Sequence, residues 1–176
     1  GSTVKSINSG ELILCTEACR ISDEIITNAS SSYSSVISNP NLVTKLEATL
    51  VKDQTPFYKG KIGTLSQIVS DTQTKRALGE RFELLAIDME TFVIGEAVSR
   101  YGLPFASVRA VTDPIDMGLP NLTGLFDSYG QVSIHRWFKY TLGHLTDLRY
   151  FPTLGWNSRK ASNVLSDFVV RFLSNY

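Results

Sequence analysis

The feature that most constrains the fold of this chain is a pair of short apolar runs on either side of a helical stretch. The runs are ELLAIDM at residues 83–89 and FASVRAV at residues 105–111, and both have the length and composition of buried strands. Residues 90–101 between them repeat apolar side chains at helical spacing, and Gly102 stands where a helix commonly ends. The pattern predicts a strand, a helix and a second strand that runs parallel beside the first, as in α/β folds.

Acidic residues follow both apolar runs. Glu90 comes after the first run and Asp113 after the second. Neighbouring parallel strands end at one edge of a sheet, and ligands of open α/β sheets bind just outside that edge, so we expect the two carboxylates to face one cleft. Asp88 is placed to cap the helix that follows it. Arg109 lies on the second predicted strand, and we expect it to pair with an acid in a structural role.

The rest of the chain favours the same class of fold. Its predicted elements are a strand at 10–18, a serine-rich loop at 30–41, a helix at 41–53, extended chain with a bend at 57–69, a helix from Asp71 to about Leu78 that Gly79 ends, and two C-terminal helices at 132–151 and 162–176. The second C-terminal helix carries an apolar stripe of Val164, Phe168 and Phe172. A chain of 176 residues is long enough for one domain with its own core, so we expect a single domain over residues 1–176.

Composition and charge exclude several classes of function. Seventeen basic and seventeen acidic residues cancel, so the sequence predicts no nucleic-acid partner. The most compact cationic group is typical of a solvated face and consists of Lys59, Lys61, Lys75 and Arg76. Cys15 and Cys19 lack the companion residues of a zinc site, so we expect ordinary thiols, and no other pattern predicts a bound metal. No apolar run is long enough to span a membrane, which favours a cytoplasmic protein.

Three short sequences around the two acids resemble the nucleoside phosphorylase superfamily. They are DME at 88–90, GLPF at 102–105 and VRAVTD at 108–113. The separation of 23 residues between Glu90 and Asp113 matches that of the family's nucleosidases, which cleave methylthioadenosine and S-adenosylhomocysteine. The extension DPIDMGLP, followed by a helical tail, is closer to the hopanoid-associated phosphorylases, which are thought to remove adenine from adenosylhopane. The resemblance implies a three-layer αβα fold around a mixed, largely parallel sheet.

The resemblance also implies a role for each matching residue. Glu90 would accept hydrogen bonds from the ribose hydroxyls, and Met89 would pack against the sugar. Asp113 would protonate or hydrogen-bond the imidazole-ring nitrogen of the leaving purine, while Ile68 and Val69 would flank the base. The implied activity is cleavage of the N-glycosidic bond of a small-molecule adenine nucleoside, without a cofactor and with phosphate as co-substrate in the phosphorylase branch. Because positive charge builds on the sugar and negative charge on the base, one acid must hold a proton while the other stays ionised.

The sequence leaves the nucleophile and the assembly open. Members of the family begin with glycine-rich strands upstream of the segment that corresponds to SGELIL at 9–14, and those strands supply the phosphate site or the carboxylate that activates water. Hydrolysis and phosphorolysis are therefore not distinguished. We expect the fold to lack its first strands and to be completed by homo-oligomerisation or by another chain. A second hypothesis is a non-catalytic nucleoside-binding or assembly subunit that keeps the acidic cleft.

Plainer structural roles compete with each assignment. Glu90 also fits a first-turn acid favoured by the helix dipole, and Asp113 fits a turn cap before Pro114. Aromatic side chains at 137–140 and 150–151 are spaced as in a helix, which predicts core packing. A minority hypothesis makes these aromatics a weak contact surface for a lipid-tailed substrate or a membrane.

Overall fold

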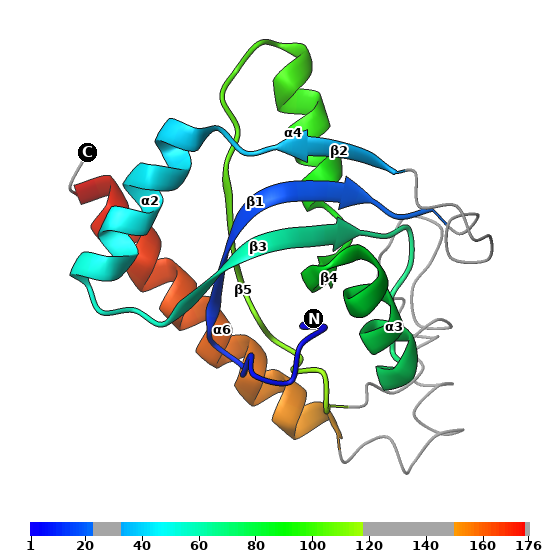
Figure 1. Ribbon diagram of the computed structural model, residues 1–176. Helices are drawn as coiled ribbons and strands as arrows, with labels where there is room; N and C mark the ends of the chain where they lie inside the picture. The colour runs from blue at the N-terminus through cyan, green and yellow to red at the C-terminus, as the bar shows by residue number, and fades with distance from the viewer. Residues whose placement is uncertain (23–32, 118–149, 175–176) are drawn as a thin grey trace, which may run out of the picture.

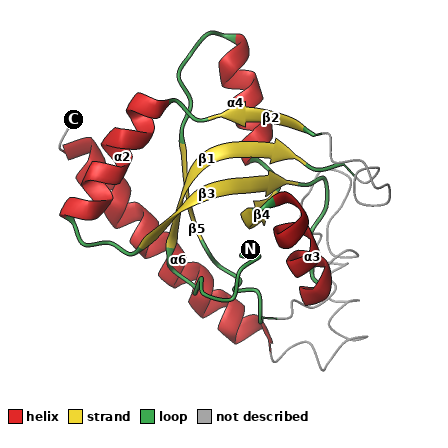
Figure 2. Cartoon of the chain, in the orientation of Figure 1, coloured by secondary structure: helices red, strands yellow, loops and turns green. Residues whose placement is uncertain are grey.

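The computed structural model describes residues 1–22, 33–117 and 150–174 (Figure 1). Within these ranges the elements are β1 (Leu12–Arg20), β2 (Ser34–Ile37), α2 (Pro40–Lys52), β3 (Phe57–Thr64), α3 (Thr72–Phe82), β4 (Leu84–Asp88), α4 (Thr91–Arg100), β5 (Ser107–Ala110) and α6 (Tyr150–Ser174). The strands form one sheet with helices packed around it (Figure 2). The mixed α/β architecture predicted from the sequence is therefore confirmed.

The sheet has the order β2-β1-β3-β4, and β3 runs parallel to both of its neighbours. The edge of β1 opposite β3 is shared by two antiparallel strands. β5 pairs with Leu12–Cys15, and β2 pairs with Glu17–Arg20. A shift of register between Cys15 and Glu17 marks an irregularity in the pairing of β1 with β3.

Alternation along β1 directs its side chains to two different cores. Leu12 and Leu14 pack in one cluster with residues of α2 and with Phe168 of α6. Ile13 and Cys15, which point the other way, pack in a second cluster with Phe92 of α4. A third cluster joins α3 to β4 and contains Leu78, Phe82, Leu84 and Ile87. The sheet is therefore covered by helices on both faces.

The prediction that the strands around α4 lie side by side and parallel is wrong. β5 pairs antiparallel with β1, whereas β4 pairs with β3. The free edge of β4 is instead occupied by the first residues of the chain, because the Gly1 carbonyl accepts from the Ile87 amide at 2.9 Å and the Thr3 amide donates to the Leu85 carbonyl at 3.0 Å. In the sheet, β4 and β5 are thus separated by β3 and β1, and residues 1–3 occupy the other edge of β4.

The helix predicted at 41–53 is confirmed as α2, which begins after the N-cap residue Asn39. The Asn39 side chain accepts hydrogen bonds from the amides of Asn41 and Leu42, both at 3.1 Å. The serine-rich segment before it is not all loop, since β2 forms within it. The strand predicted at 10–18 is confirmed as β1, and β3 forms the first part of the extended segment predicted at 57–69.

The helix predicted after Asp71 is confirmed as α3, but its predicted end at Gly79 is wrong. The Asp71 carboxylate accepts from the Thr74 amide at 2.7 Å, as an N-cap residue does. The helix continues to Phe82, and Glu83 adopts the left-handed conformation with φ 56°. Gly79 is needed for a different reason, because a Cβ atom at this position would lie 2.7 Å from the Thr3 Cβ.

The C-terminal helix α6 contains the predicted stripe, in which the rings of Phe168 and Phe172 stack at 6.1 Å. Residues 132–149 of the other predicted C-terminal helix lie outside the described residues, and so do the aromatic side chains at 137–140 and 150–151. Cys15 and Cys19 are both buried free thiols, and burial raises their pKa values to about 11 and about 12. Among the described helices, none has the length and apolar character that crossing a bilayer requires.

Candidate active site

Asp88, the last residue of β4, organises the start of α4. Its Oδ1 accepts from the backbone amides of Glu90 at 3.3 Å and Thr91 at 3.2 Å, which confirms the predicted capping role. The Thr64 hydroxyl also donates to Oδ1, at 2.8 Å, and the Thr91 hydroxyl donates to Oδ2. The end of β4 and the turn into α4 are therefore fixed by one buried carboxylate.

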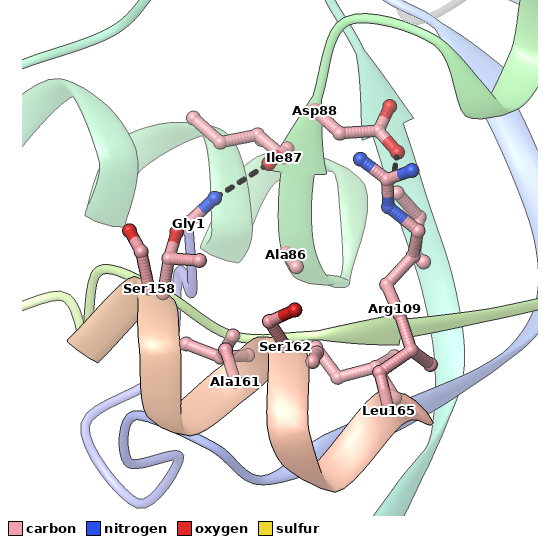
Figure 3. A pocket seen from close by; sticks show the side chains of 14 residues that line it. Gly1, Ala86, Ile87, Asp88, Arg109, Ser158, Ala161, Ser162 and Leu165 are labelled. Carbon is pink, nitrogen blue, oxygen red and sulfur yellow. Dashed lines mark hydrogen bonds and ion pairs between the residues drawn. The ribbon is translucent and has the colours of Figure 1, made fainter. Parts of the chain in front are cut away.

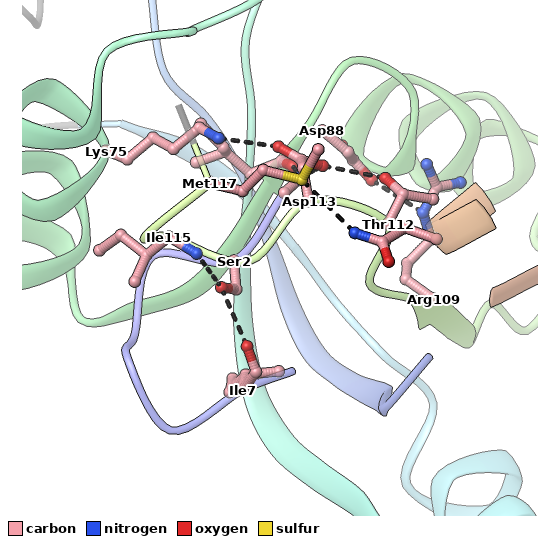
Figure 4. Close-up of polar contacts among 12 residues, drawn as sticks. Ser2, Ile7, Lys75, Asp88, Arg109, Thr112, Asp113, Ile115 and Met117 are labelled. Atoms are coloured by element: carbon pink, nitrogen blue, oxygen red, sulfur yellow. Dashed lines mark hydrogen bonds and ion pairs between the residues drawn. The ribbon is translucent and has the colours of Figure 1, made fainter. Parts of the chain in front are cut away.

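Arg109 connects this turn to β5. Its Nε lies 3.3 Å from Asp88 Oδ2, and its Nη2 donates to Glu90 Oε2 at 2.9 Å. Figure 4 shows the guanidinium reaching from β5 toward Asp88. The expected pairing of Arg109 with an acid is thus confirmed, and it involves two acids. Glu90 makes no side-chain capping bond to α4, so its carboxylate is oriented by Arg109 rather than by the helix.

Asp113 lies beyond β5 in a buried ion pair with Lys75 of α3. Lys75 Nζ donates to Asp113 Oδ2 at 2.8 Å, and the Thr112 hydroxyl donates to Oδ1 at 2.9 Å (Figure 4). The Lys75 side chain is only 1% exposed and that of Asp113 is 10% exposed. The interpretation of Lys75 as part of a solvated cationic face is therefore wrong.

The N-terminal segment holds Asp113 beside β4. The Ser2 amide donates to the Asp113 carbonyl at 3.0 Å, and the Ile115 amide donates to the Ser2 hydroxyl at 3.0 Å. Ser2 also forms an antiparallel bridge with Ala86 of β4. Asp113 thus reaches the end of β4 through residues 1–3, although the strands that precede the two acids are not neighbours.

The electrostatic surroundings favour an ionised Asp113. Burial raises the pKa of Asp113, but the positive charge of Lys75 and the hydrogen bonds from Lys75 and Thr112 act in the opposite direction, and the pKa lies below its usual range. The Gly1 nitrogen lies 3.3 Å from Oδ1. The carboxylate therefore carries a negative charge at neutral pH.

One cavity of about 270 Å³ is lined by all five residues that the sequence singled out. They are Ile68, Val69, Met89, Glu90 and Asp113. Lys75, Arg109 and Thr112 line the same cavity. A volume near 300 Å³ is at the lower end of the range for small-molecule sites. The cleft predicted between the two acids is present, although the strand pairing that suggested it is not.

A second cavity of about 350 Å³ adjoins the first and shares Gly1, Ile87, Asp88, Arg109 and Thr112 with it. Figure 3 shows this cavity between β4 and β5, with Ser158, Ala161 and Ser162 of α6 along its other side. The two hollows therefore meet at the Asp88–Arg109 pair. Among the described residues, no three His, Cys, Asp or Glu side chains gather closely enough to hold a metal ion.

The sequence reasoning missed Lys75 as a residue of the site. A signal was present, because Lys75 shares one helical face with Leu78, Gly79 and Phe82, all of which are buried. A lysine within a buried stripe requires a carboxylate partner, since lysine is almost never fully buried unless it is paired. Thr112, directly before Asp113, is a further residue that the sequence did not predict for the site, and its hydroxyl donates to the carboxylate.

Comparison with known proteins identifies the same family. A family model described as the phosphorylase superfamily matches residues 1–127. The 5′-methylthioadenosine/S-adenosylhomocysteine nucleosidase of Bacillus cereus (strain B4264) is 28% identical in a match that covers 61% of this chain and 50% of the relative. The chain thus spans about half the length of the curated relatives it matches.

Solved structures share the fold at low sequence identity. The futalosine hydrolase of Helicobacter pylori superposes with a TM-score of 0.70 at 13% identity, over 100% of this chain and 65% of that one. A mutant 5′-methylthioadenosine/S-adenosylhomocysteine nucleosidase of the same organism, with 5′-methylthioadenosine in its active site, gives a TM-score of 0.62 at 15% identity, over 96% of this chain and 64% of that one. Because the family model covers well over half of the sequence, the chain belongs to the phosphorylase superfamily.

Proposed function

We propose that this chain forms the base- and sugar-binding part of an enzyme that cleaves the N-glycosidic bond of an adenine nucleoside. The observation that carries the proposal is the single cavity lined by Glu90, Met89, Asp113, Ile68 and Val69 in a member of the phosphorylase superfamily. The curated relatives that the chain matches are 5′-methylthioadenosine/S-adenosylhomocysteine nucleosidases, which supports an adenine nucleoside as the substrate.

The proposed roles follow from the different surroundings of the two acids. Glu90 is 54% exposed and its carboxylate is held by Arg109, so it can accept hydrogen bonds from sugar hydroxyls. A fixed negative charge beside the sugar also favours the positive charge of an oxocarbenium-like transition state. Asp113 is buried beside Lys75 and faces the cavity near Ile68 and Val69. We assign Asp113 to the leaving base, where a proton must be supplied.

The nucleophile and the substituent at the 5′ position remain separate questions within this proposal. Water would make the enzyme a nucleosidase, and phosphate would make it a phosphorylase. The helical tail and the DPIDMGLP sequence favour a substrate that resembles adenosylhopane. A panel of adenine nucleosides with different 5′ groups would test that preference.

The test is adenine release from adenosine and 5′-methylthioadenosine, with and without phosphate. The protein should include any sequence that adjoins this chain in its reading frame. Asp113→Asn and Glu90→Gln should each lower kcat/KM by about 10²-fold or more, because each removes a charged group from the transition state. Asp116→Asn and Glu96→Gln are matched controls, since the first changes an exposed acid near Asp113 and the second a surface acid on α4.

The outcomes separate the proposed enzyme from its alternative. Adenine release that falls only in the two site variants supports the assigned roles, whereas equal activity in all five proteins would reject them. Adenine binding measured by calorimetry without turnover of either substrate would identify a nucleoside-binding subunit instead. If the protein shows neither adenine binding nor turnover, the chain is a structural domain.

A further inference from the structure

The acid assigned to the leaving base holds no proton of its own in this structure. Asp113 is ionised and accepts from Lys75 at 2.8 Å and from Thr112 at 2.9 Å. A carboxylate in this state can orient a base but cannot protonate it. The proton that lies closest to the carboxylate on an ionised donor is on Lys75 Nζ, whose side chain is 1% exposed.

We propose that Lys75 is a positioning residue that supplies, through Asp113, the proton taken up by the departing base. The inference rests on the proposed N-glycosidic cleavage and deepens it. A hydrogen bond of 2.8 Å joins Nζ to Oδ2, so the pair can act as an acid if Lys75 passes a proton to the carboxylate during the reaction. A helix anchors the donor, because Lys75 lies in α3 on the same face as Leu78 and Phe82.

The bond between the sugar C1′ and the purine N9 breaks, and its electron pair remains on the purine. Asp113 Oδ2 takes a proton from Lys75 Nζ and donates it to the imidazole-ring nitrogen of the base, which leaves Lys75 neutral. Water or hydrogen phosphate forms the new bond to C1′, and the proton that this nucleophile loses returns to Lys75 through solvent.

The surroundings of the pair suit this transfer. The charged side chains described around it are the cluster of Asp88, Glu90 and Arg109 that lines the same cavity, and the Gly1 nitrogen lies 3.3 Å from Asp113. Arg109 is already engaged by Asp88 and Glu90, so Lys75 is the cation committed to Asp113 among the side chains described here. Burial also shields the pair from water, which strengthens the coupling between the two groups.

A competing interpretation is that Lys75 only holds Asp113 in place by its charge. The two interpretations differ for arginine, which keeps a positive charge but does not give up a proton in proteins. They also differ for a base that needs no proton. A purine methylated at N7 leaves as a neutral molecule, so 7-methyladenosine has the same ring system without the requirement for an acid.

The experiment compares wild type, Lys75→Arg and Lys75→Met with adenosine and 7-methyladenosine as substrates, in the protein with any adjoining sequence of its reading frame. A proton supplied by Lys75 predicts that kcat for adenosine falls by about 10²–10⁴-fold in both variants. With 7-methyladenosine both variants should keep kcat within about threefold of wild type. Urea unfolding of each variant shows which of them is folded at the assay temperature.

Each result decides the matter. Wild-type activity of Lys75→Arg on adenosine overturns the inference, because charge alone then suffices. Equal losses on both substrates overturn it as well, since they indicate a structural defect. If wild type leaves 7-methyladenosine intact, the kcat of folded Lys75→Arg for adenosine decides. A loss of kcat supports the inference, and wild-type kcat overturns it. If wild type cleaves neither substrate nor 5′-methylthioadenosine, the proposed function itself has failed, which differs from every pattern above.

Discussion

Two ion-pair clusters line the candidate cavity, and they differ in their exposure to water. In the first, Arg109 bridges Asp88 and Glu90, and the arginine is 40%, Glu90 54% and Asp88 8% exposed. In the second, Lys75 and Asp113 are 1% and 10% exposed. The pairing of a cation with a carboxylate therefore occurs once with both side chains partly exposed, in Arg109 and Glu90, and once in the protein interior, in Lys75 and Asp113.

Because of this difference in exposure, we expect the two clusters to contribute differently to the stability of the fold. An exposed pair contributes about 0.2–1 kcal/mol, because solvent screens it and the side chains lose freedom when they pair. A buried pair adds little over well-packed apolar residues, but the removal of one partner leaves an uncompensated charge and costs about 3–5 kcal/mol. We therefore expect substitutions of Lys75 or Asp113 to lower the unfolding free energy strongly, and substitutions in the Arg109 cluster to lower it only slightly.

The largest expected effect is that of Lys75→Met. The variant should lose about 3–5 kcal/mol of unfolding free energy near neutral pH, because Asp113 remains buried without its principal side-chain cation. The loss should shrink as the pH falls, since a proton can then neutralise the orphaned carboxylate. The unfolding free energy of wild type should itself decrease in acid. The pKa of Asp113 is lowered in the folded state, so the stabilisation that the ionised carboxylate gives is lost as the pH falls below the ordinary value of 3.8.

A double-variant cycle sharpens this prediction. Urea unfolding of Lys75→Met, Asp113→Leu and the combined variant should show that the combined change costs less than the two single changes together. Such a recovery is expected because the combined variant buries no charge at this position. Strictly additive losses would mean that the two groups are not coupled, and the contrast with the exposed cluster would then fail.

The strand β4, the capping of α4 and the acids at both ends of the motif could be predicted because each depends on local signals. Asp88 caps the helix that directly follows it, and Glu90 stands at the same turn. The position of β5 could not be predicted, because it depends on pairing with β1, almost one hundred residues earlier. Lys75 could be predicted in part. The spacing of apolar residues in its helix indicates that it is buried, but its partner Asp113 is 38 residues away and could not be predicted.

A smaller effect is expected for Arg109→Met, which removes the cation of the exposed cluster. Asp88 keeps hydrogen bonds from Thr64 and Thr91, so the loss of unfolding free energy should stay below about 1 kcal/mol. The loss should become smaller still in high salt, because salt screens exposed pairs more than buried ones. Urea unfolding at low and high ionic strength measures both quantities. A loss as large as that of Lys75→Met would break the comparison.

The smallest effect on stability is expected for Glu90→Gln, although this residue is assigned to the substrate. Its side chain is more than half exposed and makes no cap to α4, so unfolding free energy should change by less than about 0.5 kcal/mol. Binding of an adenine nucleoside should nevertheless weaken by about 10- to 100-fold, since a hydrogen bond to a charged group contributes about 1.5–3 kcal/mol.

Glu96→Gln provides the control for this dissociation between binding and stability. Glu96 pairs with Arg100 at 3.2 Å on the surface of α4, so the control also removes a partly exposed glutamate from an ion pair with arginine. Calorimetric titration with 5′-methylthioadenosine should distinguish the two variants, whereas urea unfolding should not. If Glu90→Gln binds as tightly as Glu96→Gln, the Arg109 cluster has only the structural role that its exposure and weak coupling suggest, and the sugar must be held elsewhere in the cavity.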